Sequence, residues 1–452
     1  MSLIKKRKKI LVISHDKVGP SMAGPGIRYH RIAINLAKEH DVTLAVFNPI
    51  YIEGIEKNTY KAIDIHVQKF KDEFVKYDAI IALWLSDEMI EFAKSNNIVI
   101  IFDLYAPVPV EDLVQRVFGG KTNPKSDYDY LQMIRNYKHF VNNGDYLLVS
   151  NNEQRDFWMG YAFASEKVLP SNHVRRPIDS YFGISPMGID LNEIKDVRYK
   201  DPLSKKIKSL NKDDFVIVWT GGIWDWFDAI TPIKAMDIVV KSGKSNIKFI
   251  FLGTKHPNDD VPAMKETELA RNLANKLGLL NKNVFFLDGW IPYSERIHYF
   301  NRANIALYAH KPSIESRFSH RTRALEHILM SLPTVATRGD YFSDLIEEHQ
   351  LGIVVDPFKE SAMAKAILSL QEDTKLYNDT VNKIKKQQKI FTWDYTLKEL
   401  NIYINSINFK ASKYVKRSHQ NVSETVISSK KLKNIKKLIP TKLKSKIKSS
   451  LR

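Results

Sequence analysis

Short apolar runs alternate with helical patterns along the first half of the chain. The apolar runs lie at 10–14, 42–47, 63–67, 79–83, 98–104 and 146–150, and helical periodicity is clearest at 87–95 and 130–141. Runs that are apolar on both faces are typical of buried parallel strands, and their alternation with helices predicts a doubly wound α/β sheet. Ligands of such sheets bind at the carboxyl ends of the strands.

The same alternation starts again after about residue 190. Apolar runs recur at 215–219, 248–252, 284–287, 304–308 and 334–337, and the pattern is helical from 358 to 407. At 452 residues the chain is long enough for two ordinary domains. Two successive β/α runs therefore predict two Rossmann-like domains that face a cleft.

The stretch from Glu315 to Asp340 carries most of the candidate chemistry. Its polar residues near a predicted helix start are Glu315, Arg317, Ser319, Arg321 and Arg323. Free N–H groups, the helix dipole and guanidinium forks all favour phosphate oxygens at such a position. Glu326, within the first two helical turns, could accept hydrogen bonds from a vicinal diol such as a ribose. Arginines on a helix also occur as a solvated face, but three of them beside a carboxylate favour an anion site.

These residues resemble the donor-binding segment of nucleotide-sugar glycosyltransferases of the GT-B fold, in particular the large retaining family 4. That family carries two glutamates eight positions apart, followed by a helix and a Pro-Val-Val-like strand. Glu326 fits the second glutamate and residues 332–337 fit the strand, whereas Phe318 stands at the first glutamate and Glu315 is its candidate substitute. Residues 318–323 are similar to a Phe-Ser-x-Arg-Thr-Arg signature of a bacterial surface-polysaccharide branch.

The resemblance implies a GT-B architecture with two doubly wound domains. It places an acceptor domain at 1–188, a nucleotide-sugar donor domain at 189–390 and a helix that crosses back to the first domain at 391–410. A basic amphipathic tail follows at 411–452.

In the first domain, the resemblance assigns the glycine-rich loop after the first strand to the donor phosphates and the acceptor. The candidate residues there are Gly24, Gly26 and Arg28. Asp103 ends a strand where many retaining relatives carry a His-Asp pair, and Phe102 occupies the histidine position. We therefore expect Asp103 to contact the sugar or the acceptor and, with Glu315 and Arg321, to form the catalytic set.

In the second domain, the loop after the first strand has no Lys or Arg where the family carries a basic pair. Gly221 and Gly222 remain candidate donor contacts, and we expect Arg317, Arg321 and Arg323 to supply the missing charge. Trp224 and Trp226 either stack on a sugar or pack at the domain boundary. By resemblance, the nucleobase lies between the ends of two strands, and the residues there are Thr254, Trp290 and Ile291.

No metal or cofactor is expected beyond the nucleotide-diphosphate sugar used as substrate. Asp127 and Asp129 form an Asp-x-Asp pair, but they open a helical pattern, where capping and the helix dipole explain them. The chain has no cysteine, which excludes disulfides, thiolate metal sites and a cysteine nucleophile.

Positive charge is concentrated in the tail. Residues 411–452 contain thirteen Lys or Arg and one acidic residue, so they carry twelve of the eighteen excess positive charges. Apolar residues recur there at helical spacing, which predicts two interfacial helices on an anionic membrane. Nucleic-acid binding and a disordered basic tail are the alternatives, and the regular apolar period argues against nucleic acid. No signal peptide or membrane-spanning run is evident.

Together these features predict a metal-independent glycosyltransferase that acts on a glycan or lipid-linked acceptor, and the resemblance implies retention of configuration. We expect it in the cytoplasm, peripheral to the inner face of the membrane, in surface polysaccharide or lipopolysaccharide biosynthesis. The alternatives are a sugar-nucleotide epimerase and a non-catalytic GT-B partner protein, the latter prompted by Phe102, Phe318 and the uncharged loop at Gly221.

Overall fold

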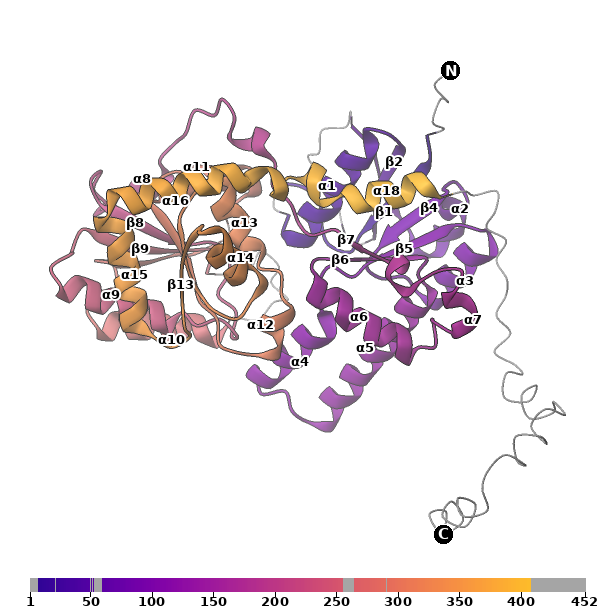
Figure 1. Ribbon diagram of the computed structural model, residues 1–452, viewed down its shortest axis with the longest axis horizontal. Helices are drawn as coiled ribbons and strands as arrows, with labels where there is room; N and C mark the ends of the chain where they lie inside the picture. The colour runs from indigo at the N-terminus through magenta and orange to yellow at the C-terminus, as the bar shows by residue number, and fades with distance from the viewer. Residues whose placement is uncertain are drawn as a thin grey trace, which may run out of the picture. The chain divides into compact units, whose positions relative to one another are not determined.

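Seven parallel strands form the first sheet, in the order β3-β2-β1-β4-β5-β6-β7 (Figure 1). The computed structural model describes residues 7–20, 22–48, 50, 52, 59–254, 264–289 and 291–407. The strands are β1 (Lys9–Ser14), β2 (Asp41–Phe47), β3 (Lys61–Ile65), β4 (Ala79–Ala82), β5 (Val99–Asp103), β6 (Tyr146–Val149) and β7 (Phe182–Ile184). The helices of this half are α1 (Gly24–Ala37), η1 (Val67–Lys69), α2 (Phe70–Phe74), α3 (Asp87–Ser95), α4 (Val108–Phe118), α5 (Pro124–Asn143), α6 (Asn152–Ala164), α7 (Pro170–His173) and η2 (Ile178–Tyr181).

Strand β1 shows why the apolar runs are continuous. Ile10 and Val12 pack in a core with residues of α1, whereas Leu11 and Ile13 pack in a second core with residues of α3 and α5. Successive side chains of a strand point to opposite faces, so a sheet covered by helices on both faces needs apolar residues at every position.

Six parallel strands form the second sheet, in the order β10-β9-β8-β11-β12-β13. They are β8 (Phe215–Trp219), β9 (Ile247–Leu252), β10 (Val284–Leu287), β11 (Ile305–Tyr308), β12 (Thr334–Thr337) and β13 (Gly352–Val355). The helices that accompany them are η3 (Leu191–Ile194), α8 (Pro202–Lys206), α9 (Ile230–Lys241), α10 (Lys265–Lys276), η4 (Tyr293–Glu295), α11 (Arg296–Phe300), α12 (Ile314–Phe318), α13 (Thr322–Leu329), α14 (Tyr341–His349), α15 (Glu360–Glu372), α16 (Thr374–Gln387) and η5 (Gln388–Phe391).

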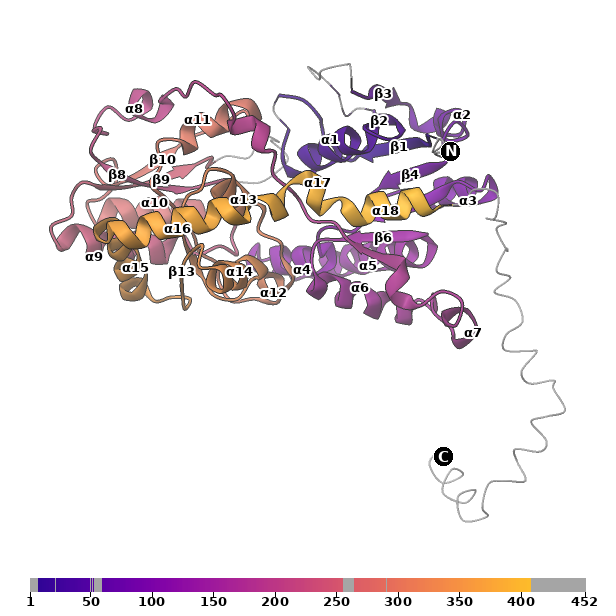
Figure 2. The same cartoon turned by 45° about the horizontal axis from the view of Figure 1, so that its top comes forward.

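The end of the described chain returns to the first half. Helices α17 (Trp393–Thr396) and α18 (Lys398–Ser406), drawn in yellow, lie against α1 and β7 (Figure 2). Asn35 of α1 donates to Asp394 Oδ1 at 2.8 Å, and the backbone N–H of Ile184 donates to Glu399 Oε2 at 2.8 Å. Gly188 fits tightly there, because an added Cβ would lie 2.8 Å from the backbone nitrogen of Trp393.

Several helices begin earlier than their sequence patterns indicate. Helix α1 starts at Gly24, so the predicted glycine loop is partly its first turn. Helix α5 starts at Pro124 behind an Asn123 cap, which places Asp127 in the first turn and not at the cap. Arg317 and Glu315, expected in a loop, lie in the short helix α12. Pro124 at N1 and the Asn123 cap set the start of α5, and the Ser313 cap sets the start of α12.

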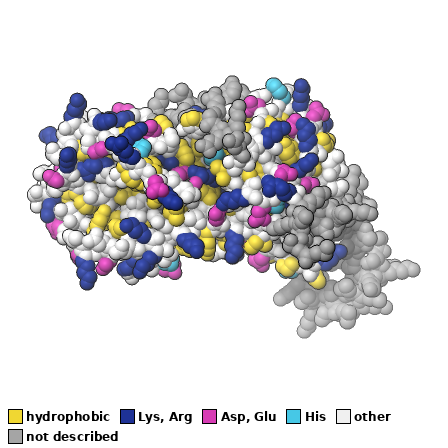
Figure 3. All heavy atoms as spheres, turned by 90° about the horizontal axis from the view of Figure 1, so that it is seen from above, with side chains coloured by type: hydrophobic (Ala, Val, Ile, Leu, Met, Phe, Trp, Pro, Cys, Tyr) yellow, Lys and Arg dark blue, Asp and Glu magenta, His cyan; other side chains and the backbone are white. Residues whose placement is uncertain are grey.

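Charged side chains of both signs are scattered over the face seen from above in Figure 3. Among the described residues, no helix combines the length and the hydropathy needed to cross a bilayer. The tail at 411–452 and its predicted membrane segments lie outside the described residues.

Candidate active site

A cavity of about 700 Å³ is lined by residues from both halves of the chain. Its walls come from the segment before and at the start of α1, the linker at 187–190, the loops after β8, β9 and β10, and helices α10, α11 and α13. The predicted site residues that line it are Gly24, Gly221, Gly222, Thr254, Ile291, Arg323 and Glu326. Loops at the carboxyl ends of parallel strands thus form the cavity, as expected for this class of sheet.

Arg323 is the positively charged residue of α13 that lines the cavity, next to the loop after β8. Its Nη2 donates to the carbonyl oxygen of Gly222 at 2.9 Å, and its guanidinium lies 4.1 Å from the ring centre of Phe227. Its Nη1 is buried with no hydrogen-bond partner among the described residues. Burial and the neighbouring Arg321 lower the pKa of Arg323 to about 9. A bound anion would relieve both the missing hydrogen bond and the cost of the buried charge.

Two local features place this guanidinium at the cavity. Gly221 has φ +73°, a left-handed conformation that favours glycine and that turns the chain after β8. Helix α13 begins at Thr322, which also lines the cavity, so its free N–H groups add to the positive potential beside Arg323.

Glu326 lies three residues further along α13, on the same wall. Its Oε1 accepts a hydrogen bond from Arg296 Nε at 3.0 Å, while its Oε2 is buried and unpaired within the described part of the chain. Burial raises the pKa of Glu326, and Arg296 opposes this shift. Positions i and i+3 of a helix are neighbours on one face, so the guanidinium of Arg323 and the carboxylate of Glu326 lie side by side.

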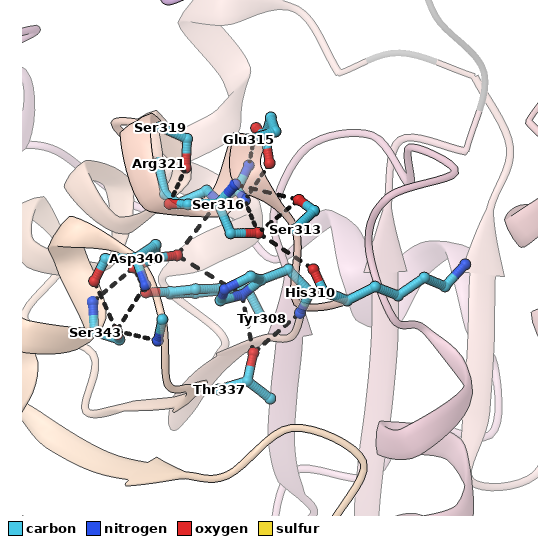
Figure 4. Close-up of polar contacts among 12 residues, drawn as sticks. Tyr308, His310, Ser313, Glu315, Ser316, Ser319, Arg321, Thr337, Asp340 and Ser343 are labelled. Atoms are coloured by element: carbon cyan, nitrogen blue, oxygen red, sulfur yellow. Dashed lines mark hydrogen bonds and ion pairs between the residues drawn. The ribbon is translucent and has the colours of Figure 1, made fainter. Parts of the chain in front are cut away.

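Arg321 lies at the N-cap of α13 but does not line the cavity, and its guanidinium points toward Glu315 and Asp340 (Figure 4). It binds both carboxylate oxygens of Glu315, at 2.7 and 2.8 Å, and Asp340 Oδ2 at 3.3 Å. Burial disfavours its charge, but Glu315 and Asp340 outweigh this and raise the pKa of Arg321. The structure therefore places Glu315 and Arg321 in a paired network beside the cavity wall, away from the position expected for a phosphate or sugar contact.

Arg28 and Asp103 also form a buried pair. Arg28 Nε and Nη2 each donate to Asp103 at 2.6 Å, and Nη2 also donates to the carbonyl oxygen of Ser185 at 2.8 Å. Neither side chain is exposed or lines the cavity. Asp103, which was expected to contact the sugar, is thus paired with Arg28, which was expected to contact phosphate. Phe102, next to Asp103 in the chain, stacks on Phe140 in the core.

Three more of the predicted residues, Gly26, Arg317 and Ser319, do not line the cavity. Gly26 allows close packing, because an added Cβ would lie 2.3 Å from the carbonyl oxygen of Lys17. Ser319 is buried and donates to the carbonyl oxygen of Ser316 at 3.2 Å. Arg317 is exposed beside the ring of Phe318. Trp290 lies outside the described residues.

A family model matches most of the second half of the chain. Residues 201–387 match the model for glycosyl transferases group 1. No curated protein sequence matches the chain significantly.

Solved structures of glycosyltransferases share the fold of the whole described chain. Anabaena Alr3699/HepE in complex with UDP has a TM-score of 0.61 at 13% identity, with 88% of this chain and 100% of that chain covered. Sucrose-phosphate synthase from Thermosynechococcus elongatus scores 0.56 at 18% identity, over 90% and 100% of the two chains. WaaG, a glycosyltransferase involved in lipopolysaccharide biosynthesis, scores 0.56 at 16% identity, over 88% and 100%. These structures confirm the predicted GT-B fold, and the family match at 201–387 supports the predicted glycosyltransferase class.

The structure adds cavity residues that sequence patterns did not indicate. Arg296 and Tyr293 line the wall beside Glu326, and Asp190 of the linker lies nearby. At the end formed by β9 and β10, Asp288 Oδ1 accepts from Thr254 Oγ1 at 3.0 Å and from Arg271 Nη2 at 2.6 Å. Arg271, Asp288 and Arg296 stand in no recognisable motif, because each has a side-chain partner distant in sequence.

Glu111 is a further residue that no motif indicated. It lies in the first turn of α4, which contacts α12, the helix that carries Glu315. Burial raises the pKa of Glu111 to about 7, and the negative charge of Glu315 adds to this shift. Glu111 therefore takes up a proton near neutral pH at the contact between the two halves.

Replacing Arg321 with Met tests the structural role of the Figure 4 network. The change leaves Glu315 and Asp340 buried without their cation, so we expect the free energy of unfolding to fall by about 3–5 kcal/mol. Urea unfolding measures this loss. A stability equal to that of the wild type would show that the pair is not the structural element described here.

The pH dependence of stability tests the state of Glu111. Its folded pKa of about 7 lies above the ordinary value of 4.5, so the unfolded chain loses its proton first. The stability that Glu111 contributes is present below pH 4.5 and is lost as the pH rises through 7. A Glu111→Gln variant should therefore gain stability over the wild type between pH 4.5 and 7, by at most about 3 kcal/mol. A difference in the free energy of unfolding between Glu111→Gln and the wild type that stays constant from pH 4.5 to 7 would contradict the assignment.

Proposed function

We propose that the protein transfers a sugar from a nucleoside diphosphate sugar to a glycan or lipid-linked acceptor. The observation that carries this proposal is the pairing of two unsatisfied groups on one face of α13. Arg323 Nη1 is a buried cationic donor and Glu326 Oε2 a buried anionic acceptor, and the two side chains line the same cavity. A nucleoside diphosphate has the matching chemistry, because its phosphates adjoin a ribose with two neighbouring hydroxyls.

The same arrangement favours departure of the diphosphate. Negative charge develops on the leaving phosphate in the transition state, and fixed donors stabilise that charge without reorganisation. Arg323 and the first N–H groups of α13 are such donors on this wall. The residues before and at the start of α1 form part of the wall from the first half, where we place the acceptor hydroxyl.

Retention of configuration and independence of metal belong to this proposal. Asp103 and Glu315 are each bound at both carboxylate oxygens by an arginine, so neither is positioned as a free nucleophile. Retention without an enzyme nucleophile would then proceed by attack on the face from which the diphosphate leaves. Arg323 and the helix start supply positive charge that a metal ion would otherwise provide.

Two relatives of the same fold suggest the donor and the pathway. Structures of Alr3699/HepE hold UDP and UDP-glucose, and WaaG is involved in lipopolysaccharide biosynthesis. We therefore propose a UDP-type donor and a place in surface polysaccharide assembly of the family 4 kind. The basic tail at 411–452 would hold the protein at the cytoplasmic face of an anionic membrane.

Nucleotide binding and the Arg323→Gln variant test this function. Thermal unfolding is measured with UDP, GDP, dTDP, ADP and CMP, each with and without EDTA. One diphosphate should stabilise the protein by about 2.7 kcal/mol at a hundred times its dissociation constant, in both conditions. Loss of a charge-assisted hydrogen bond should weaken that binding about 10- to 100-fold in Arg323→Gln.

Arg317→Gln is the matched control, because Arg317 lies nearby in sequence but is exposed outside the cavity. It should bind the diphosphate as the wild type does, and the unliganded melting temperatures show whether either variant is misfolded. Equal affinity in the two variants would refute the proposed phosphate site. Stabilisation that EDTA abolishes would refute independence of metal.

A further inference from the structure

A line of charged side chains joins α1 to the cavity residue Glu326. Arg31 of α1 contacts Glu193 in η3, Glu193 contacts Arg296 in α11, and Arg296 contacts Glu326 in α13. Arg31 also binds Asp190 Oδ2 at 2.6 Å. The side chains are between 13% and 25% exposed, so water screens these contacts only in part.

Glu193 is the branch point of this line. Its Oε1 accepts from Arg31 and, at 2.6 Å, from the hydroxyl of Tyr293, while its Oε2 accepts from Arg296 Nη2. Nothing in the sequence pairs Glu193 with Arg296, which lies 103 residues later.

Each of the three guanidinium nitrogens of Arg296 has a partner as a result. Its Nε donates to Glu326 Oε1 at 3.0 Å, its Nη1 donates to the carbonyl oxygen of Tyr293 at 2.7 Å, and its Nη2 is held by Glu193. An arginine commonly grips a carboxylate with two nitrogens. Here the contact with Glu193 limits Arg296 to one bond with Glu326, which leaves Glu326 Oε2 unpaired within the described residues.

The charges of the cluster do not cancel. Arg31 and Arg296 face three carboxylates, those of Asp190, Glu193 and Glu326. The excess negative charge and the unpaired oxygen of Glu326 suit a ligand group that donates hydrogen bonds without carrying negative charge. Sugar hydroxyls have this chemistry.

We propose that Glu193 is a positioning residue for the nucleotide ribose: it holds Arg296 so that Glu326 Oε2 stays available to two neighbouring hydroxyls. This inference rests on the proposed function of the cavity and extends it to a residue that does not line it. Because Arg31 anchors Glu193 from α1, the hydroxyl-binding state of Glu326 depends on contact between the two halves of the chain.

A Glu193→Gln variant separates this role from a general structural one. Without the carboxylate, Arg296 is free to close on both oxygens of Glu326. The probes are the diphosphate that stabilises the wild type most, its 2′,3′-dideoxy form, and inorganic pyrophosphate. We expect the wild type to prefer the ribose form over the dideoxy form by about tenfold or more, and Glu193→Gln to lose this preference. Pyrophosphate should bind both proteins equally, because it has no ribose.

Asp394→Asn is the matched control. Asp394 also bridges to Asn35 of α1 and to Lys38 directly after it, but it does not line the cavity. It should keep the wild-type preference for ribose. The inference is overturned if Glu193→Gln retains that preference, if its affinities for the diphosphate, its dideoxy form and pyrophosphate fall equally, or if the wild type binds a diphosphate without preferring ribose. Absence of any diphosphate binding by the wild type would overturn the proposed function as well.

Discussion

The cost of an unpaired buried charge explains how the site is organised. A charged group that leaves water must find a partner or a ligand, because isolated burial costs several kcal/mol. Arg28 is paired with Asp103, and Arg321 is paired with Glu315. Arg323 and Glu326 are each satisfied on one side only, and both line the cavity. These two groups on the cavity wall therefore mark where we place the ligand.

The two sheets bring these groups together from distant parts of the chain. In each sheet the strands are parallel, so the loops at their carboxyl ends gather at one edge, and the cavity is lined from such loops in both halves. Two segments connect the halves of the chain: the linker before η3, and the helices α17 and α18, which return to α1 and β7. Glu193 and Arg31 add a charged contact between the halves that leads directly to the cavity wall.

The architecture was predictable because its signals are local. Strands covered on both faces must be apolar throughout, and β1 and β5 were recognisable for this reason. Glu326 was also found from sequence, because the helix and strand that follow it form a motif. Arg321 and Arg323 show what a local pattern cannot predict. They stand two residues apart, yet Arg321 binds Glu315 and Asp340, whereas Arg323 binds the carbonyl oxygen of Gly222. Their partners lie up to about a hundred residues away, so local pattern does not distinguish a paired arginine from a ligand-binding one.

A crystal structure of the protein with the nucleoside diphosphate that it binds would test the central claim most directly. The account predicts a phosphate oxygen within about 3 Å of Arg323 Nη1 and a ribose hydroxyl within about 3 Å of Glu326 Oε2. It also predicts that the pairs Arg28–Asp103 and Arg321–Glu315 remain closed. A diphosphate bound away from α13, with Arg323 Nη1 and Glu326 Oε2 still unpaired, would contradict it.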